Sequence, residues 1–217
     1  MRIHADLSQP AIVTPGDYRW VDSPQQGVNR MMLDRIGEEC ARATSLVRYE
    51  RGTSFPSHVH PGGEEILVLE GIFRDDGGDH PAGCYLRHPS GSSHAPSSTH
   101  GTTIFVKLRQ MDEGDTRDVR VDTSDPSQWA PRPGGMVCIL HTYADESVAI
   151  HRLDAGYALF DEPVDNLEIF VVSGELHGET TAYPQGSWLR FPSGCPVQFV
   201  AGSEGVTVYL KTGHLPC

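Results

Sequence analysis

Short apolar or alternating runs, separated by turns rich in glycine and proline, make up most of the chain. Residues 43–49 (ATSLVRY), 64–70 (EEILVLE) and 102–108 (TTIFVKL) carry the β-branched and aromatic residues typical of strands. Residues 64–70 are apolar at both parities, which predicts a strand buried on both faces. Gly37 disfavours a helix within residues 31–50, so two strands are expected there. With 23 Gly, 16 Pro and no long helical pattern, the sequence predicts an all-β fold.

The second half of the chain repeats the pattern of the first. Residues 166–174 (NLEIFVVSG) align with residues 63–71 (GEEILVLEG) at an offset of 103, and VTVYLK at 206–211 answers IFVKL. Core and turn positions are retained, so two barrels in tandem are expected. The same offset pairs Gly83 with Gly186, Arg87 with Arg190, Pro89 with Pro192 and Gly91 with Gly194.

The repeat and the turn residues predict three regions. Residues 1–110 should form an N-terminal arm and the first barrel, residues 111–135 an acidic, proline-rich connector on the surface, and residues 136–217 the second barrel. Tyr18 and Trp20 are isolated aromatics in the arm. They suggest that the arm packs on a neighbouring barrel or a second subunit, so we expect a homodimer.

The charge balance excludes several classes of partner. Asp plus Glu number 29 against 17 Lys plus Arg, which gives a net charge of −12. This charge repels phosphate backbones and anionic lipids, so we expect neither nucleic-acid nor membrane binding. The chain has no apolar run of about 18 residues and no basic-then-apolar leader, which predicts a cytoplasmic protein. Its five cysteines are far apart and form no C-x-x-C pair, which favours free thiols.

One stretch carries residues typical of a metal site. His58 and His60 are two positions apart, so both rings would leave one face of an extended strand. Residues 61–63 (PGG) predict a turn, after which Glu64 would begin the returning strand beside the histidines. His94 follows a second turn signal and would enter from another strand. Three imidazoles and one carboxylate suit one divalent ion, with zinc as the first expectation and iron, manganese or nickel as alternatives.

Other side chains in this stretch are weaker candidates. Glu65 is the rival of Glu64, but period-2 alternation would turn it away from the histidines. His88 and His100 are interpreted as exposed loop residues. The pattern alone therefore favours His58, His60, Glu64 and His94 as the metal ligands.

The second half lacks these ligands. At the offset of 103, His58 and His60 become Asp161 and Pro163, Glu64 becomes Leu167, and His94 becomes Val197. Proline, leucine and valine side chains cannot bind a divalent cation. We therefore expect a second barrel without metal, filled with apolar side chains.

The spacings G-x5-H-x-H-x3-E-x6-G (from Gly52) and G-x5-P-x-G-x2-H (from Gly83) resemble the two halves of the cupin signature. Residues 20–110 further resemble the cupin domain of ChrR-type anti-sigma factors and their stand-alone relatives. This resemblance implies a double-barrel cupin fold, with zinc or a related metal held by His58, His60, Glu64 and His94. ChrR proteins bind their sigma factor through a separate N-terminal zinc domain. No segment before Ala43 matches that domain, so sigma-factor binding is not expected from this chain.

Three functions fit such a site. The first is a sensor or regulatory module of a stress response, which binds metal and a small-molecule effector. The second is a metal-dependent dioxygenase acting on a small diketone or hydroxyketone, since three histidines and a carboxylate leave coordination positions open. The third is a purely structural metal that staples strands together. The sequence identifies no catalytic residue beyond the metal ligands.

Overall fold

The computed structural model describes residues 1–38 and 40–215, which fold into two compact all-β units. The first unit comprises Met1–Ala5 and Arg19–Ser124, and the second comprises Asp6–Tyr18 and the chain from Asp125 onward. The tandem barrel fold predicted from the sequence is therefore confirmed. Within the described residues, no helix is long and apolar enough to cross a bilayer.

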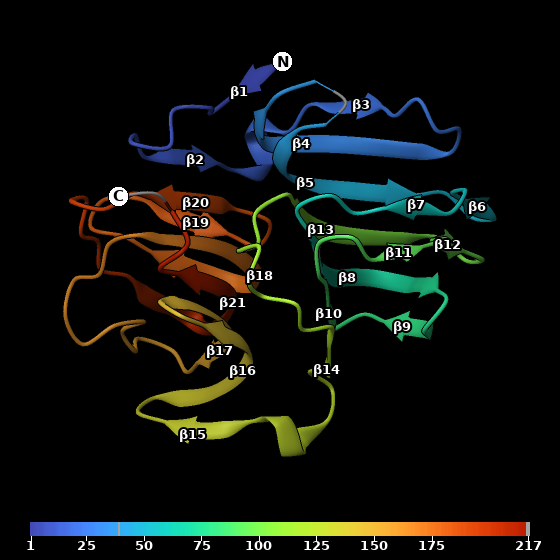
Figure 1. Ribbon diagram of the computed structural model, residues 1–217. Helices are drawn as coiled ribbons and strands as arrows, with labels where there is room; N and C mark the ends of the chain where they lie inside the picture. Colours follow the sequence, from blue (N-terminus) through green and yellow to red (C-terminus); the bar gives the residue numbers. More distant parts are fainter. Residues whose placement is uncertain (39, 216–217) are drawn as a thin grey trace. The chain divides into compact units, whose positions relative to one another are not determined.

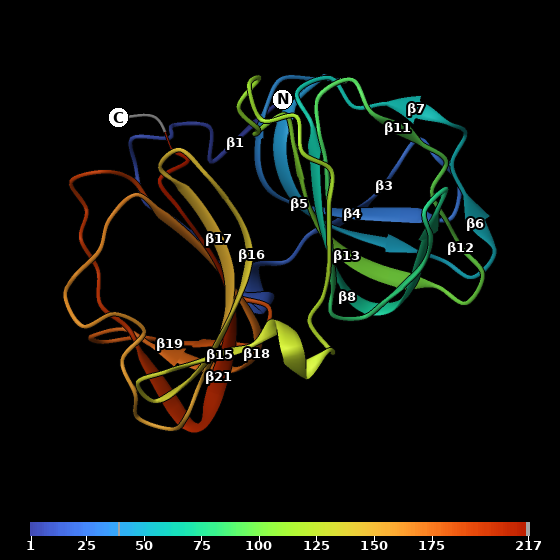
Figure 2. The ribbon, with the colours of Figure 1, turned by 60° about the horizontal axis from the view of Figure 1, so that its bottom comes forward.

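The main sheet of the first unit has the strand order β1-β4-β5-β13-β8-β10-β14, with β3 on the outer edge of β4 (Figure 1). Short strands β6, β7, β9, β11 and β12 complete the unit, and β7 lies beside β11 (Figure 2). The bounds are β1 Arg2–Ile3, β3 Trp20–Asp22, β4 Val28–Ile36, β5 Arg42–Tyr49, β6 Thr53–Ser54, β7 His58–Val59, β8 Glu64–Asp75, β9 Gly78–Pro81, β10 Cys84–His88, β11 Ser93–His94, β12 Ser97–Ser98, β13 Thr102–Leu108 and β14 Val119–Asp122.

The second unit is built on the order β15-β16-β17-β21-β18-β20-β2, with β19 paired to β18. Its central pair, β18 and β21, matches β8 and β13 of the first unit in register, as the repeat predicts. The bounds are β2 Ala11–Val13, β15 Ala130–Arg132, β16 Gly135–Tyr143, β17 Glu146–Leu153, β18 Leu167–His177, β19 Ala182–Pro184, β20 Trp188–Phe191 and β21 Val200–Thr212, with 3-10 turns η1 Pro15–Asp17 and η2 Pro126–Gln128.

Two segments differ from the regions expected from the sequence. The N-terminal arm is shared, because β1 pairs with β4 of the first unit and β2 pairs with β20 of the second. The acidic segment 111–135 contains two strands, since β14 pairs with β10 and β15 pairs with β16. Proline-rich segments can supply edge strands because an edge needs fewer backbone donors than a central position. The segment 111–135, expected as a plain connector, therefore carries paired edge strands as well.

Strand β8 decides which side chains face the interior of the first unit. Ile66 and Val68 belong to its apolar core, and Glu65 lies on the opposite face. Opposite β13 the register shifts after Val68, so one extra residue is inserted in β8. This bulge reverses the parity, as bulges do, and brings Phe73 and Asp75 to the inner side. Both faces of residues 64–68 are buried, but Leu69 is half-buried and Glu70 is exposed, so the prediction for residues 64–70 holds only for the first five.

Candidate metal centre

Two short strands bring two of the predicted ligands together. Strands β7 and β11 pair antiparallel with His58 directly opposite His94 (Figure 2). His60 follows two residues after His58, and its ring centroid lies 5.0 Å from that of His58 and 4.4 Å from that of His94. Glu64 begins β8 immediately after the turn at Pro61-Gly62. The β7–β11 pairing and the turn after His60 therefore bring these four side chains close together, although β7 ends at Val59, before His60.

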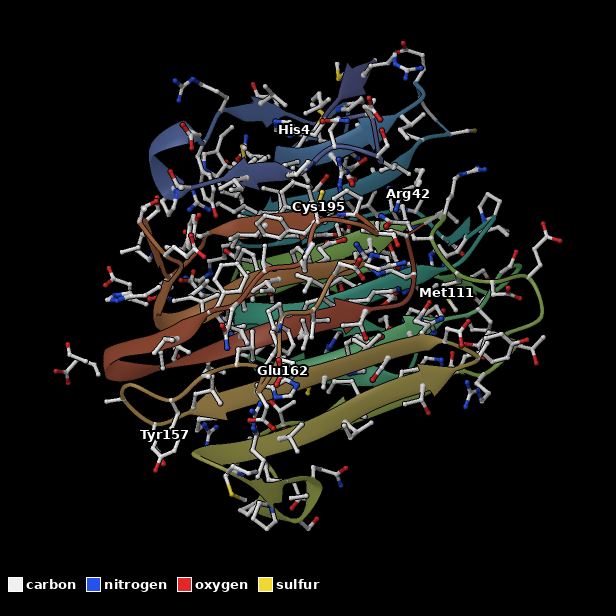
Figure 3. All side chains as sticks on the ribbon, turned by 90° about the vertical axis from the view of Figure 1, so that its left-hand side faces the viewer. His4, Arg42, Met111, Tyr157, Glu162 and Cys195 are labelled. Atoms are coloured by element: carbon white, nitrogen blue, oxygen red, sulfur yellow. The ribbon has the colours of Figure 1, made fainter. Side chains whose placement is uncertain are left out.

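Gly63 sets the position of Glu64. It has a φ of +76°, which L residues with side chains rarely adopt, and a Cβ there would lie 2.2 Å from the Met111 sulfur. Met111, labelled in Figure 3, thus occupies the space that a side chain at Gly63 would need. The backbone amide of Gly63 donates to the carbonyl of His60. A glycine is therefore needed to hold Glu64 close to the histidine pair.

The four predicted side chains converge on one point. Each of His58, His60, Glu64 and His94 offers one ligand atom, and these atoms all lie within 4.8 Å of one another. Glu64 Oε2 is 3.5 Å from His60 Nε2 and 3.3 Å from His94 Nε2. Ligand atoms about 2.1 Å from a tetrahedral ion stand about 3.4 Å apart, so these spacings fit a shared divalent ion. The cluster could hold a metal.

The outer nitrogens of His58 and His60 each have a neighbour that orients the ring. His58 Nδ1 lies 3.1 Å from the carbonyl oxygen of Pro56, and His60 Nδ1 lies 3.2 Å from Ser92 Oγ. Ser92 Oγ donates to the Pro89 carbonyl, so its oxygen accepts from His60. With Nδ1 acting as the donor, Nε2 keeps its lone pair for an ion, which is the arrangement expected of metal-binding histidines.

Buried atoms at the centre lack protein partners. His60 Nε2 and Glu64 Oε2 are both inaccessible to solvent and have no hydrogen-bond partner. Burial, followed by the neighbouring His94 ring, lowers the pKa of His60 to about 3, so this imidazole is neutral near pH 7. Burial raises the pKa of Glu64 above its usual range. A cation would provide a partner for both atoms, so the residues present fit a metal.

The cluster is open on one side. His60, Glu64 and His94 are 4%, 7% and 3% exposed, whereas His58 is exposed. The Phe55 ring lies 6.1 Å from the His58 ring and also lines a cleft of about 640 Å³ within the first unit. Other lining residues of this cleft include Val21, Pro24, Gln25, Arg30, Met32 and Arg35. None of the four predicted ligands lines this cleft, so the exposed side of the cluster is defined by His58 alone.

The structure corrects the interpretation of His88 and adds Asp75 to the neighbourhood of the histidines. His88 ends strand β10 with its side chain only 14% exposed, while His100 is exposed as predicted. Asp75, at the end of β8, is 9% exposed because the bulge in β8 turns it inward. Its Oδ2 lies 3.5 Å from both His94 Nδ1 and His88 Nε2. A bulge cannot be located from an alternating pattern alone, so sequence reasoning missed Asp75.

The charge on Asp75 follows from these contacts. Burial alone would raise its pKa, but contacts with His80, His88 and His94 hold the pKa far below its usual range. The pKa of His88 is shifted upward. Burial would lower this pKa, but the contacts with Asp75 and Asp118 raise it. Asp75 is therefore an anion at neutral pH.

Glu65, the rival for Glu64, lies on the other face of β8. Tyr85 Oη donates to Glu65 Oε2 at 2.9 Å, and Arg87 Nη1 lies 3.1 Å from Glu65 Oε1. Glu65 is thus part of a buried polar group away from the histidines. The alternation argument that favoured Glu64 is consistent with this geometry.

In the second unit apolar residues occupy the equivalent positions. Leu167 begins β18 as Glu64 begins β8, and it is fully buried in an apolar cluster. Phe191 stands opposite Leu167 as His88 stands opposite Glu64. Val197, the equivalent of His94, packs against the same cluster, as does Cys195, labelled in Figure 3. The apolar filling predicted for the second barrel is confirmed.

Residues 8–112 match the family described as the ChrR cupin-like domain. The comparison with curated proteins gave no match.

Several solved structures are similar in fold. A putative dioxygenase from Nostoc punctiforme is 13% identical with a TM-score of 0.77, covering 95% of this chain and 83% of that chain. The bacterial pirin YhhW of Escherichia coli, in complex with nickel(II), is 14% identical with a TM-score of 0.71, covering 96% and 100%. Oxalate decarboxylase of Bacillus subtilis, with Mn(II) centres, is 12% identical with a TM-score of 0.67, covering 95% and 78%.

Proposed function

We propose that the chain is a metal-dependent dioxygenase acting on a small diketone or hydroxyketone. The proposal is supported by the match of residues 8–112 to the ChrR cupin-like domain and by the fold shared with a putative dioxygenase. The four proposed ligands are His58, His60, Glu64 and His94. The observation that carries the proposal is the exposure of His58 beside three buried ligands. A site open on one side favours an exchangeable ligand over a closed structural metal.

The chain's own residues supply the binding site. Phe55 and Tyr49, whose ring centroids are 5.6 Å apart, form an apolar wall next to the centre. Burial and the nearby Glu64 raise the pKa of Tyr49 above its usual range, so its phenol stays protonated. The cleft lined by Phe55 has the volume of a small-molecule site. When bound, a divalent ion would polarise a substrate carbonyl as a Lewis acid, and iron would in addition support reaction with O2.

The test combines elemental analysis with oxygen uptake. Iron-loaded protein should consume O2 in the presence of 2,4-pentanedione or a hydroxyacetophenone, and both oxygen atoms should appear in the cleaved products. The His60→Ala variant should show no uptake, while Asp161→Ala, at the equivalent position of His58 in the second barrel, should match the wild type. Iron-loaded wild-type protein that cleaves neither compound would exclude this function.

The match to the ChrR cupin-like domain favours a second candidate. In this case the same four residues would hold zinc, and an effector reaching the ion past His58 would alter binding to a regulatory partner. Zinc in the purified protein, absence of turnover, and metal-dependent co-purification with a sigma factor encoded beside the gene would support the sensor. Iron together with turnover would support the dioxygenase.

A further inference from the structure

A second group of ligand atoms lies directly behind His94. Asp75, His88 and His94 each offer one ligand atom, and these atoms lie within 4.8 Å of one another. Asp75 Oδ2 is 3.5 Å from His88 Nε2 and 3.5 Å from His94 Nδ1. These spacings match those at the first cluster, where Glu64 Oε2 stands 3.3 and 3.5 Å from its histidine nitrogens.

The nitrogens of this group are buried without hydrogen-bond partners. His88 Nε2 and His94 Nδ1 are both inaccessible to solvent, and neither makes a hydrogen bond. Their 3.5 Å separations from Asp75 are longer than the 2.7–3.2 Å usual for a bond from nitrogen to oxygen. Atoms around a tetrahedral ion would instead stand about 3.4 Å apart. The geometry fits three ligands around one ion better than three hydrogen-bonded side chains.

Each ligand of this group also has an outer partner. Asp75 Oδ1 lies 2.6 Å from His80 Nε2 and accepts from the Gly77 amide at 2.8 Å, so its other oxygen is directed inward. His88 Nδ1 lies 3.2 Å from Asp118 Oδ2. Hydrogen bonds of this kind orient the ligands of protein-bound metals and fix the imidazole tautomer. The group therefore has both an inner and an outer set of contacts.

We propose that Asp75, His88 and His94 form a second metal site, in which the His94 imidazolate bridges two divalent ions through Nε2 and Nδ1. The inference depends on one part of the proposed function, namely that His94 Nε2 binds the first ion; it does not depend on the dioxygenase activity. Two nitrogens and one carboxylate oxygen suit zinc or copper(II). The second ion replaces the Nε2 proton of His88 and the Nδ1 proton of His94, which leave to solvent. One doubly charged ion thus takes the place of two protons, and the net charge of the buried group is unchanged.

The second barrel supports this assignment because it lacks all four members of the group and its contacts. At the positions equivalent to Asp75, His80, His88 and His94 it has Gly178, Tyr183, Phe191 and Val197. Tyr183 and Phe191 are part of its apolar cluster. The barrel therefore forms without these polar residues. Burying them in the first unit costs desolvation free energy, which a bound ion would offset.

The experiment counts metal ions per folded chain after saturation with zinc and removal of excess, using native mass spectrometry and elemental analysis. Wild-type protein should retain two ions, and His88→Ala should retain one. Asp75→Asn should also lose the second ion. The matched control is His100→Ala, which removes an exposed histidine of the same unit and should retain two. Circular dichroism of each variant establishes that it is folded.

A copper(II) form tests the bridge itself. Two copper ions joined by the His94 imidazolate should be spin-coupled, so the integrated paramagnetic resonance signal at low temperature should fall well below two spins per chain. His88→Ala should give one full spin. A wild-type protein that binds a single ion, a His88→Ala variant that keeps two, or two uncoupled spins would each overturn the inference. Failure of the proposed function looks different, because iron-loaded wild-type protein would then consume no more oxygen than His60→Ala while its count of bound ions stayed at two.

Discussion

In the first unit Glu64 on β8 stands opposite His88 on β10, whereas in the second unit the matching pair is Leu167 and Phe191. Around the first pair lie three more histidines, and around the second lies one continuous apolar cluster. The strand pairing is nevertheless the same, with β13 and β21 in corresponding registers. The comparison teaches that this strand framework forms with either interior.

The two interiors differ in energy. Apolar burial stabilises the second unit by about 25 cal/mol per Å² of buried apolar surface. In the first unit, buried His60 Nε2 and Glu64 Oε2 lack partners, and each such group costs about 1–3 kcal/mol. We infer that the first barrel accepts lower stability in order to keep a side-chain cluster that could hold a metal, as functional sites often do.

The largest expected effect is the loss of metal binding from one barrel alone. His94→Ala should remove all stoichiometric metal. His60→Ala removes a ligand and should weaken the first site by more than about 100-fold, because loss of a mere hydrogen-bond partner of a ligand already costs up to about 100-fold in affinity. The equivalent changes in the second barrel, Asp161→Ala and Val197→Ala, should leave metal content unchanged. Competition with a chromophoric chelator measures these affinities. A His94→Ala protein with full metal content would refute the assignment of the ligands.

The next effect concerns the free energy of unfolding, for which the second barrel should be the more sensitive of the two. Leu167→Ala empties part of a fully buried apolar cluster and should lower the free energy of unfolding by about 3 kcal/mol. Glu64→Ala, at the equivalent position, should not lower it in chelator and should raise it by up to about 1–3 kcal/mol, because the substitution removes the unpaired buried Glu64 Oε2. Urea denaturation with and without metal tests both variants. Equal losses in chelator would show that the two interiors do not differ as described.

The tandem barrels and four side chains of the first site followed from local signals. Alternation placed His58 and His60 on one face, and the turn glycines at 62 and 63 returned the chain so that Glu64 could meet them. The repeat located Leu167 and Val197 without any structure. Features that depend on pairing between strands far apart in the sequence could not be predicted from such local signals.

Asp75 is the clearest example of what the sequence could not provide. Its inward orientation depends on one residue inserted opposite β13, and a bulge is a property of two paired strands. His88 was placed on the surface for a related reason. Only the pairing of β10 with β8 shows that it stands opposite Glu64. Strand β2 likewise depends on β20, which is more than 170 residues further along the chain.

The smallest expected effect is the pH dependence that a buried histidine of the second unit gives to the free energy of unfolding. His151 on β17 accepts a hydrogen bond at Nδ1 from Arg132 Nη1 at 2.7 Å. Burial, followed by the charge of Arg132, lowers the pKa of His151 to about 4. The unfolded chain, with a histidine pKa near 6.5, therefore binds a proton that the folded chain excludes. Stability from this residue is fully present above about pH 6.5 and is lost as the pH falls towards 4.

For this residue we expect a loss of about 2 kcal/mol, after allowing for solvent screening of its partly exposed ring. His151→Gln keeps an acceptor for Arg132 but does not titrate, so it should flatten the stability profile between pH 4 and 6.5. His100→Gln, at an exposed histidine of the first unit, should leave the profile unchanged. Urea denaturation at several pH values in chelator measures the slope. Because His151 lies outside the metal centre, adding zinc should not alter its contribution, and a zinc-dependent slope at His151 would mean that the two barrels are coupled rather than independent.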